Sequence, residues 1–168
     1  MHIELRPEPL TRAAFAPFGD VIETTGHDFL SINYGHTERY HDLMTLDALE
    51  AGGKPTVSIF RTRPRAFPIA LEVVERHPLG SQAFICLERR PFITVVAPPT
   101  AGDQPDPGQL RAFLVGSSQG INYRRGTWHH YLFSLEQPAD FICIDRSGGQ
   151  VGNCDEYRLE ETVFISNT

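Results

Sequence analysis

The residues best suited to acid–base or metal chemistry lie in one short stretch that begins at Glu75. Side chains two apart on a strand point to the same face, so Glu75 and His77 project together while Arg76 points the other way. A turn at 78–80 follows, and the next strand begins with Gln82. The sequence therefore predicts a carboxylate, an imidazole and an amide on one interior face.

A second stretch, residues 120–130, supplies another imidazole. A turn bounded by glycines is followed there by His129, at the start of an aromatic strand. We interpret the two stretches as halves of one pocket. By strand parity His130 should face the opposite, outer side, where a substitution would cost little activity.

Length and composition predict one globular domain over residues 1–168. The chain is 40% hydrophobic and 21% charged, which is ordinary for such a domain. No apolar run approaches the roughly 18–20 residues of a membrane span, and the first residues lack the apolar segment of a secretory signal. We therefore expect a cytoplasmic protein with no membrane partner. The net charge of −6 gives no basic surface for nucleic acid, so an anionic substrate needs local arginines.

The three cysteines predict thiols and not a disulfide framework. Cys86, Cys143 and Cys154 form no CxxC pair and are an odd number in a chain without a secretory signal. Cys86 and Cys143 lie within apolar strands, so we interpret them as small buried hydrophobic residues.

Short apolar runs separated by proline and glycine predict a chain built mostly of strands. The expected strands are 20–23, 56–61, 70–77, 82–87, 92–97, 109–115, 121–123, 128–135, 140–145 and 162–165. Helix is expected only as a turn at 11–15 and a brief segment at 44–50, and a polar loop is expected at 24–42. Without βαβ alternation, this pattern predicts a mainly β fold, an antiparallel barrel or jelly roll with few short helices.

The two chemical stretches resemble the motifs of the cupins. There an HxH pair precedes a glutamate by four or five residues, and a second motif reads PxGxxH. This chain has Glu75-x-His77, then Gln82, and Arg124-x-Gly126-x-x-His129. It is more closely similar to the ureidoglycolate lyases of that superfamily. The blocks that carry this similarity are FGDVIE (18–23), RYHDL (39–43), ERHPLGSQAFI (75–85), RAF (111–113), GINY (120–123), WHH (128–130), DR (145–146) and NCD (153–155).

The chain departs from the family pattern at three places. Family members read NYHRGxWHHP, whereas Arg124 and Tyr131 replace the histidine and the proline here, and Tyr34 replaces an asparagine in Asn-Asn-Gly. We expect these positions near the pocket mouth, where they would alter substrate preference or rate.

The resemblance implies cleavage of ureidoglycolate into glyoxylate and urea, a late step of allantoin and purine breakdown. The reacting carbon carries a hydroxyl, a carboxylate and a ureido nitrogen, so the elimination needs one base and one acid. The family's tendency to dimerise, together with many edge-capable strands, predicts a homodimer.

The candidate site residues form overlapping groups. The expected catalytic residues are Glu75 and His77, which would transfer protons or bind metal, and His129, which would bind metal or orient the leaving urea. Those expected to bind the substrate are Arg39, Arg61, Gln82, Tyr123 and Trp128. If a divalent metal such as Ni²⁺ or Zn²⁺ is bound, the expected ligands are Glu75, His77, Gln82 and His129, a set poorer in nitrogen than that of metal oxygenases. No organic cofactor is expected.

Each candidate has a purely structural alternative, and two other functions stay open. Glu75 could be an exposed strand-edge carboxylate, His77 and His129 could be satisfied core histidines, and Gln82 could bond strand backbone. The other functions are a metal-dependent cupin oxygenase or isomerase, which would take up oxygen through bound iron, and a cupin that binds a small carboxylate without turning it over.

Overall fold

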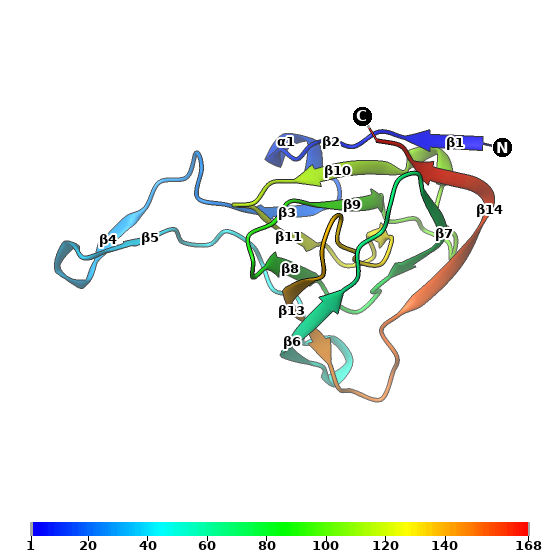
Figure 1. The fold of residues 1–168 in the computed structure, drawn as a ribbon. Coiled ribbons are helices and arrows are strands. Elements are labelled where there is room, and N and C mark those ends of the chain that lie inside the picture. The colour runs from blue at the N-terminus through cyan, green and yellow to red at the C-terminus, as the bar shows by residue number, and fades with distance from the viewer. Residues whose placement is uncertain (1, 168) are drawn as a thin grey trace.

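The computed structural model describes residues 2–167 and consists mainly of strands in two facing sheets (Figure 1). One sheet contains β1 (His2–Leu5), β2 (Glu8–Pro9), β7 (Ile69–Arg76), β9 (Phe92–Ala97), β10 (Arg111–Val115), β12 (Trp128–His129) and β14 (Asp155–Ile165). The other contains β3 (Gly19–Ile22), β6 (Lys54–Thr62), β8 (Gln82–Cys86), β11 (Gly120–Tyr123) and β13 (Ala139–Ser147). The predicted mainly β, cupin-like fold is confirmed.

Strand order places the chemical stretches next to one another. The seven-stranded sheet runs β1-β14-β7-β12-β9-β10-β2, and the five-stranded sheet runs β3-β11-β8-β13-β6. Most pairs are antiparallel, but β1 pairs with β14, and β2 with β10, in parallel. Strands β7 and β12 are thus neighbours in one sheet, as β8 and β11 are in the other.

The helical content is small, as predicted. Helix α1 (Arg12–Phe15) is a single turn whose first amides are capped by Thr11, which accepts a bond from Ala14 N at 3.2 Å. Three short 3₁₀ segments are η1 (Asn33–Gly35), η2 (Glu50–Gly52) and η3 (Pro107–Gln109). No helix in the described part of the chain is long and apolar enough to cross a membrane.

The main hydrophobic core fills the space between the sheets. Its large members, Phe84, Phe92, Phe113, Ile121 and Phe141, are at most 3% exposed. Burial of each such side chain stabilises the fold by about 1.5–3 kcal/mol. The core therefore fixes the spacing of the two sheets that carry the chemical residues.

A second core covers the other face of the seven-stranded sheet. On β9, Phe92 and Val96 belong to the main core, while the alternate residues Ile93 and Val95 belong to this second cluster with Trp128. The seven-stranded sheet is consequently buried on both faces.

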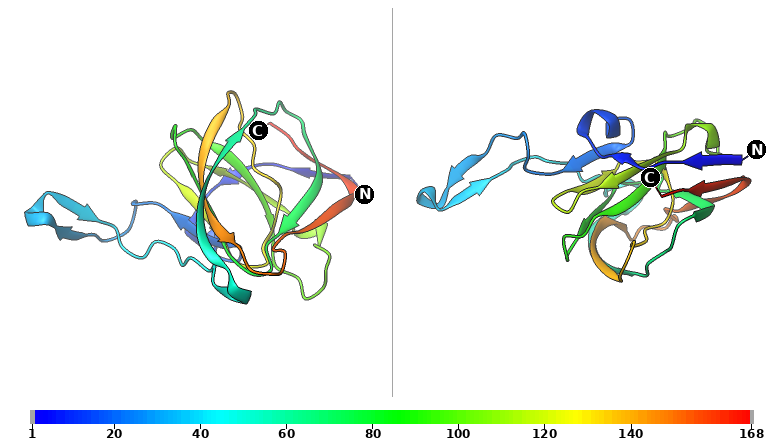
Figure 2. Two further views of the ribbon diagram at one scale, coloured as in Figure 1. Left: turned by 90° about the horizontal axis from the view of Figure 1, so that it is seen from below. Right: turned by 45° about the horizontal axis from the view of Figure 1, so that its top comes forward.

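Residues 24–42 form a projecting arm, although a loop was predicted. Strands β4 (Leu30–Ile32) and β5 (Thr37–Arg39) pair as an antiparallel hairpin that extends away from the body (Figures 1 and 2). At its tip Asn33 and Tyr34 both have positive φ, 52° and 59°, and Gly35 follows. Asparagine and glycine suit this turn better than tyrosine does.

Two other predicted elements were wrong. Residues 43–49, here called the strap, have no regular secondary structure. Their backbone bonds residues at the five-stranded sheet instead, since Ser81 N, directly before β8, donates to Asp47 O at 2.8 Å. The strand predicted at 128–135 ends at His129, since Ser134 exchanges backbone hydrogen bonds with Arg63 and Arg65.

Candidate active site

Glu75, His77 and His129 converge at one end of the space between the sheets. Strands β7 and β12 place Glu75 directly opposite His129, and His77 follows at the end of β7. One ligand atom from each of the three residues lies within 4.8 Å of the others. Parity along β7 gives Glu75 and His77 their common direction, as the sequence predicted.

Backbone carbonyls fix the orientation of both imidazoles. His77 Nδ1 lies 2.6 Å from Asn153 O, and His129 Nδ1 lies 3.0 Å from Thr127 O. A carbonyl only accepts, so each Nδ1 carries the proton and donates it. Each Nε2 is buried, and within residues 2–167 neither has a hydrogen-bond partner.

The local electrostatics keep the carboxylate ionised and one imidazole neutral. His129 Nε2 lies 3.4 Å from Glu75 Oε1, at ion-pair distance but without hydrogen-bond geometry. The neighbouring His129 lowers the pKa of Glu75 although burial opposes this. Burial lowers the pKa of His77, which favours its neutral form.

A thiol completes the surroundings of Glu75. Cys154 Sγ lies 3.6 Å from Glu75 Oε2. Burial, together with the Glu75 charge, raises the pKa of Cys154 to about 11. The group therefore stays protonated at neutral pH and donates a weak hydrogen bond to the carboxylate.

The five-stranded sheet supplies the opposite wall. The Tyr123 ring stacks on His129, with centroids 4.2 Å apart and planes inclined by 20°, and its hydroxyl bonds Thr94 Oγ1 at 2.7 Å. Gln82 Nε2 donates to Asp145 Oδ2 at 3.2 Å. The buried Gln82 Oε1 has no partner among the described residues. Gln82 and Tyr123 thus lie beside the three converging groups.

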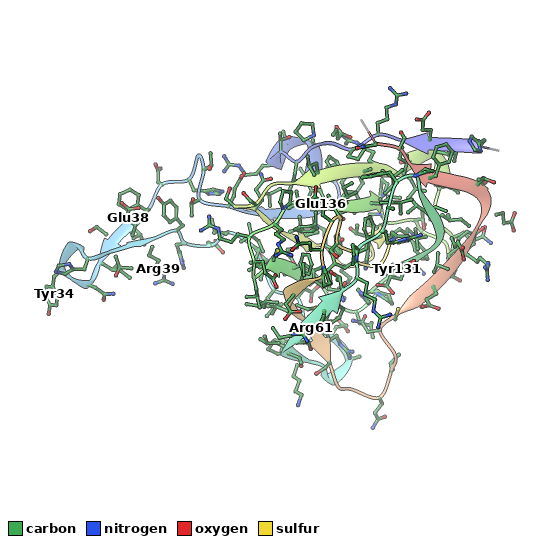
Figure 3. All side chains as sticks on the ribbon, in the orientation of Figure 1. Tyr34, Glu38, Arg39, Arg61, Tyr131 and Glu136 are labelled. Atoms are coloured by element: carbon green, nitrogen blue, oxygen red, sulfur yellow. The ribbon has the colours of Figure 1, made fainter. Side chains whose placement is uncertain are left out.

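Three predicted substrate contacts are not brought to this place. Arg61 lies on the outer face of β6, where Nε and Nη2 each donate to Asp140 at 2.8 Å. Trp128 points to the opposite side of β12 from His129, into the second core beneath Arg76. Arg39 lies on the projecting arm, away from the two sheets of its own chain (Figure 3).

The prediction for His130 was partly wrong. It does face away from His129, but it is only 2% exposed because Phe133, Tyr131 and Arg65 pack around it. Burial lowers the pKa of His130 to about 4. The outer face of the seven-stranded sheet carries its own core, so facing outward does not mean facing solvent.

The departures from the family pattern lie in different surroundings. Tyr131 is half-exposed. Its ring lies 3.8 Å from that of His130, centroid to centroid, and its hydroxyl accepts a bond from Arg65 Nη1 at 3.0 Å. Tyr34 is fully exposed at the tip of the arm. Neither lies beside the three converging groups, so the expectation that both sit at the pocket mouth was wrong.

Sequence reasoning assigned no role to Asp145, Asn153 or Cys154, although blocks of the family pattern contain all three. Asn153 acts twice: its backbone carbonyl accepts from His77, and its side-chain oxygen accepts from Leu79 N at 2.7 Å. This loop therefore fixes both the imidazole and the turn between β7 and β8. Only the spacing of the NCD block pointed to it.

The donor set fits a divalent metal ion. Two buried Nε2 atoms without hydrogen-bond partners lie close to an ionised carboxylate, and carbonyls hold the far nitrogens of both rings. Metal-binding histidines are commonly oriented in this way. Glu75, His77 and His129 are the residues that would hold the ion, with the Gln82 oxygen as a further donor.

A separate cavity lies at the other end of the interior. It has a volume of about 340 Å³, and Arg90, Phe92, Ser134 and Phe141 are among the residues that line it. Phe92 and Phe141 are at the ends of β9 and β13 that lie away from His129 and Asp145. None of its lining residues belongs to the converging set.

Comparison with known proteins identifies the family of the chain. The family model described as Ureidoglycolate lyase matches residues 2–166. The chain is 51% identical to the ureidoglycolate lyase of Burkholderia mallei (strain NCTC 10229) over 160 residues, which is 95% of this chain and 92% of the relative. It is 50% identical to that of Pseudomonas aeruginosa (strain LESB58) over 157 residues, with coverage of 94% and 91%. With the converging glutamate and histidines inside the matched region, the chain belongs to the ureidoglycolate lyase family.

Proposed function

We propose that this protein cleaves ureidoglycolate into glyoxylate and urea in purine breakdown, with Glu75, His77 and His129 at the reacting carbon. Membership of the ureidoglycolate lyase family supports this assignment of the reaction. The convergence of these three side chains supports the proposed location of the active site. They are the charged and metal-ligating residues that the two chemical stretches bring together.

The reaction balances without any net gain or loss of protons. The hydroxyl of the hemiaminal carbon loses its proton, the C–O bond becomes a carbonyl, and the C–N bond breaks. The departing ureido nitrogen takes up a proton and leaves as urea. One group that accepts the first proton and returns it to nitrogen is sufficient.

Glu75 is suited to carry that proton. Its lowered pKa keeps it ionised at neutral pH, as a base must be before the reaction. The thiol of Cys154 donates to the carboxylate on one side, and His129 Nε2 lies 3.4 Å from its other oxygen. His77, neutral and with its Nε2 unbonded within the described residues, is suited to bind or orient.

A divalent metal, Ni²⁺ or Zn²⁺, held by Glu75, His77 and His129, would act as a Lewis acid and balance the substrate's negative charge. Within the described chain Arg61 faces elsewhere, and Arg39 lies on the arm. Gln82 and Tyr123 therefore remain the neutral groups placed to contact the substrate.

We infer that the working form is a cytoplasmic homodimer. Three free cysteines, two of them buried, are consistent with a reducing compartment. The exposed apolar surface considered below supports self-association.

The decisive experiment is incubation of purified, metal-analysed protein with racemic ureidoglycolate, with urea and glyoxylate measured separately. Equal production of both, above the spontaneous breakdown rate, is the expected result. Removal of metal with a chelator and return of Ni²⁺ or Zn²⁺ tests the metal site. Oxygen consumption, or binding without turnover, would instead favour the oxygenase or the non-catalytic cupin.

A further inference from the structure

The outer face of the five-stranded sheet carries an aliphatic surface. Register pairs Ile59 with Ile142 and Ile142 with Ile85, and it also pairs Val57 with Ile144. The same line of paired residues continues across β11 at Gly120 to Ile22 on β3, the edge strand of the sheet. None of these side chains faces the core between the sheets, because they alternate with Phe84, Phe141 and Cys143.

This surface is open in the single chain. Val57 is 68% exposed and Ile59 is 56% exposed, while Ile22, Ile85 and Ile142 are half-buried. The ion pair of Arg61 with Asp140 borders it on one side. An apolar centre with a charged border is the usual composition of a protein–protein interface.

The arm is the second unpartnered feature. Its hairpin extends away from the body next to β3, an edge strand of the five-stranded sheet (Figures 1 and 2). Phe29 is 48% exposed and Leu30 is 54% exposed, and Tyr34 stands in solvent. An isolated two-stranded hairpin is marginally stable in water and needs a surface to pack against. Within residues 2–167 the hairpin strands pair only with each other.

The total exposed surface area of the chain is larger than that expected for a monomer of its mass. The chain exposes 9410 Å². A monomer of 18.8 kDa is expected to expose about 8,300 Å². The excess of about 1,100 Å² is close to the roughly 800 Å² per partner that a stable interface buries.

We propose that the arm and the aliphatic face form one two-fold interface, in which the arm of each copy packs over the sheet face of a second copy. The arm follows β3, an edge strand of the sheet that carries the aliphatic face, and a two-fold axis lets each copy cover the exposed surface of the other. The inference rests on the proposed homodimer and goes further by naming the surface. The groove at the base of the arm, about 260 Å³ and lined by Ile22, Leu43 and Ile85 among others, belongs to the same face.

Light scattering after size-exclusion chromatography tests the interface. The wild-type chain should elute at about twice 18.8 kDa. Ile59→Lys places a charge in the centre of the aliphatic face without touching the core, and should raise the dimer dissociation constant about tenfold or more. Replacement of residues 28–41 by a short Gly-Ser linker should do the same. Leu114→Lys is the matched control, because Leu114 is 42% exposed on β10 of the other sheet, and it should remain dimeric.

The outcomes are distinguishable. A monomeric wild type at micromolar concentration would overturn the homodimer and the interface together, whatever the enzyme's activity. A dimer unaffected by both Ile59→Lys and removal of the arm would overturn the interface alone. If either variant loses the circular dichroism of the wild type, Leu30→Ser with Tyr34→Ser tests the arm more gently, and persistence of the full dimer would then count against the proposal.

Discussion

His129 is paired directly with Glu75 across the β12–β7 ladder, and its Nε2 lies 3.4 Å from Glu75 Oε1. Two residues 54 positions apart are thus held together by sheet register. Because the backbone fixes both, either side chain can be changed without moving the other. A change in activity after substitution of either residue can therefore be attributed to the side chain that was replaced.

Glu75→Gln removes the charge of the carboxylate and preserves its shape. We expect turnover to fall by about 10²–10⁴-fold, since a proton-transfer group or metal ligand is lost. The fold should persist, because Glu75 lies in a partly open site. Urea release, corrected for spontaneous breakdown, is the measurement. Near-full corrected activity in this variant would place the chemistry elsewhere.

His129→Asn and His130→Asn separate activity from stability. The first should reduce urea release strongly, because Nε2 of His129 faces the reacting groups. The second should leave turnover nearly unchanged but lower the free energy of unfolding by about 1–3 kcal/mol, since it disturbs a buried polar group. Activity assays and separate unfolding titrations with urea as the denaturant check the two variants. A loss of activity in His130→Asn with full activity in His129→Asn would contradict the assignment.

Asn153→Ala should weaken the site without touching the substrate. It leaves the Leu79 amide unpaired and loosens the loop whose carbonyl orients His77. We expect a loss of about 10–100-fold in metal affinity or activity. Asn153→Asp keeps the accepting oxygen and should recover most of the loss. Titration of Zn²⁺ or Ni²⁺ by calorimetry gives a readout independent of turnover. If both variants bind the metal as tightly as the wild type, Asn153 does not have this role.

Arg61→Gln should leave the Michaelis constant unchanged. The guanidinium pairs with Asp140 on the outer face of β6, away from the converging residues. A Michaelis constant raised several-fold, in a variant whose mass in solution matches the wild type, would show that Arg61 reaches the substrate.

The Asp47–Arg125 pair should make stability depend on pH in acid. Hydrogen bonds from Arg125, at 2.7 and 2.8 Å, lower the pKa of Asp47. The stabilisation is present above the unfolded pKa of about 3.9 and is lost as pH falls through the lower folded value. Both side chains are over a third exposed, so its size is about 0.2–1 kcal/mol. Asp47→Asn should be less stable than wild type by this amount at pH 7, and a difference that persisted at the acid end would contradict the pairing.

Local geometry explains what the sequence could predict. Strand parity and the turn at 78–80 were sufficient to place Glu75, His77 and Gln82 together. The same parity, applied to Trp128 as it was to His130, would have shown that Trp128 faces away from the site. The error arose because Trp128 was chosen for its residue type, without regard to the face of the strand to which its side chain points.

Long-range packing explains what the sequence could not predict. The strap at 43–49 has helix-forming residues, but hydrogen bonds from Ser81 and Asn122 to its carbonyls hold it against the five-stranded sheet without regular structure. Burial of His130 depends on a second core that assembles from distant segments. The parallel pairing of β1 with β14 leaves no periodic signal, because it joins the two ends of the chain.

The position of β7 between β12 and β14 has a consequence for biosynthesis. Residue 76 is made 79 positions before residue 155, the first of β14. At about 5–20 residues per second, a ribosome takes roughly 4–16 s to cover that distance. During this interval the strand that carries Glu75 has a bare edge, and the nascent chain is open to wrong pairing until its last long strand emerges.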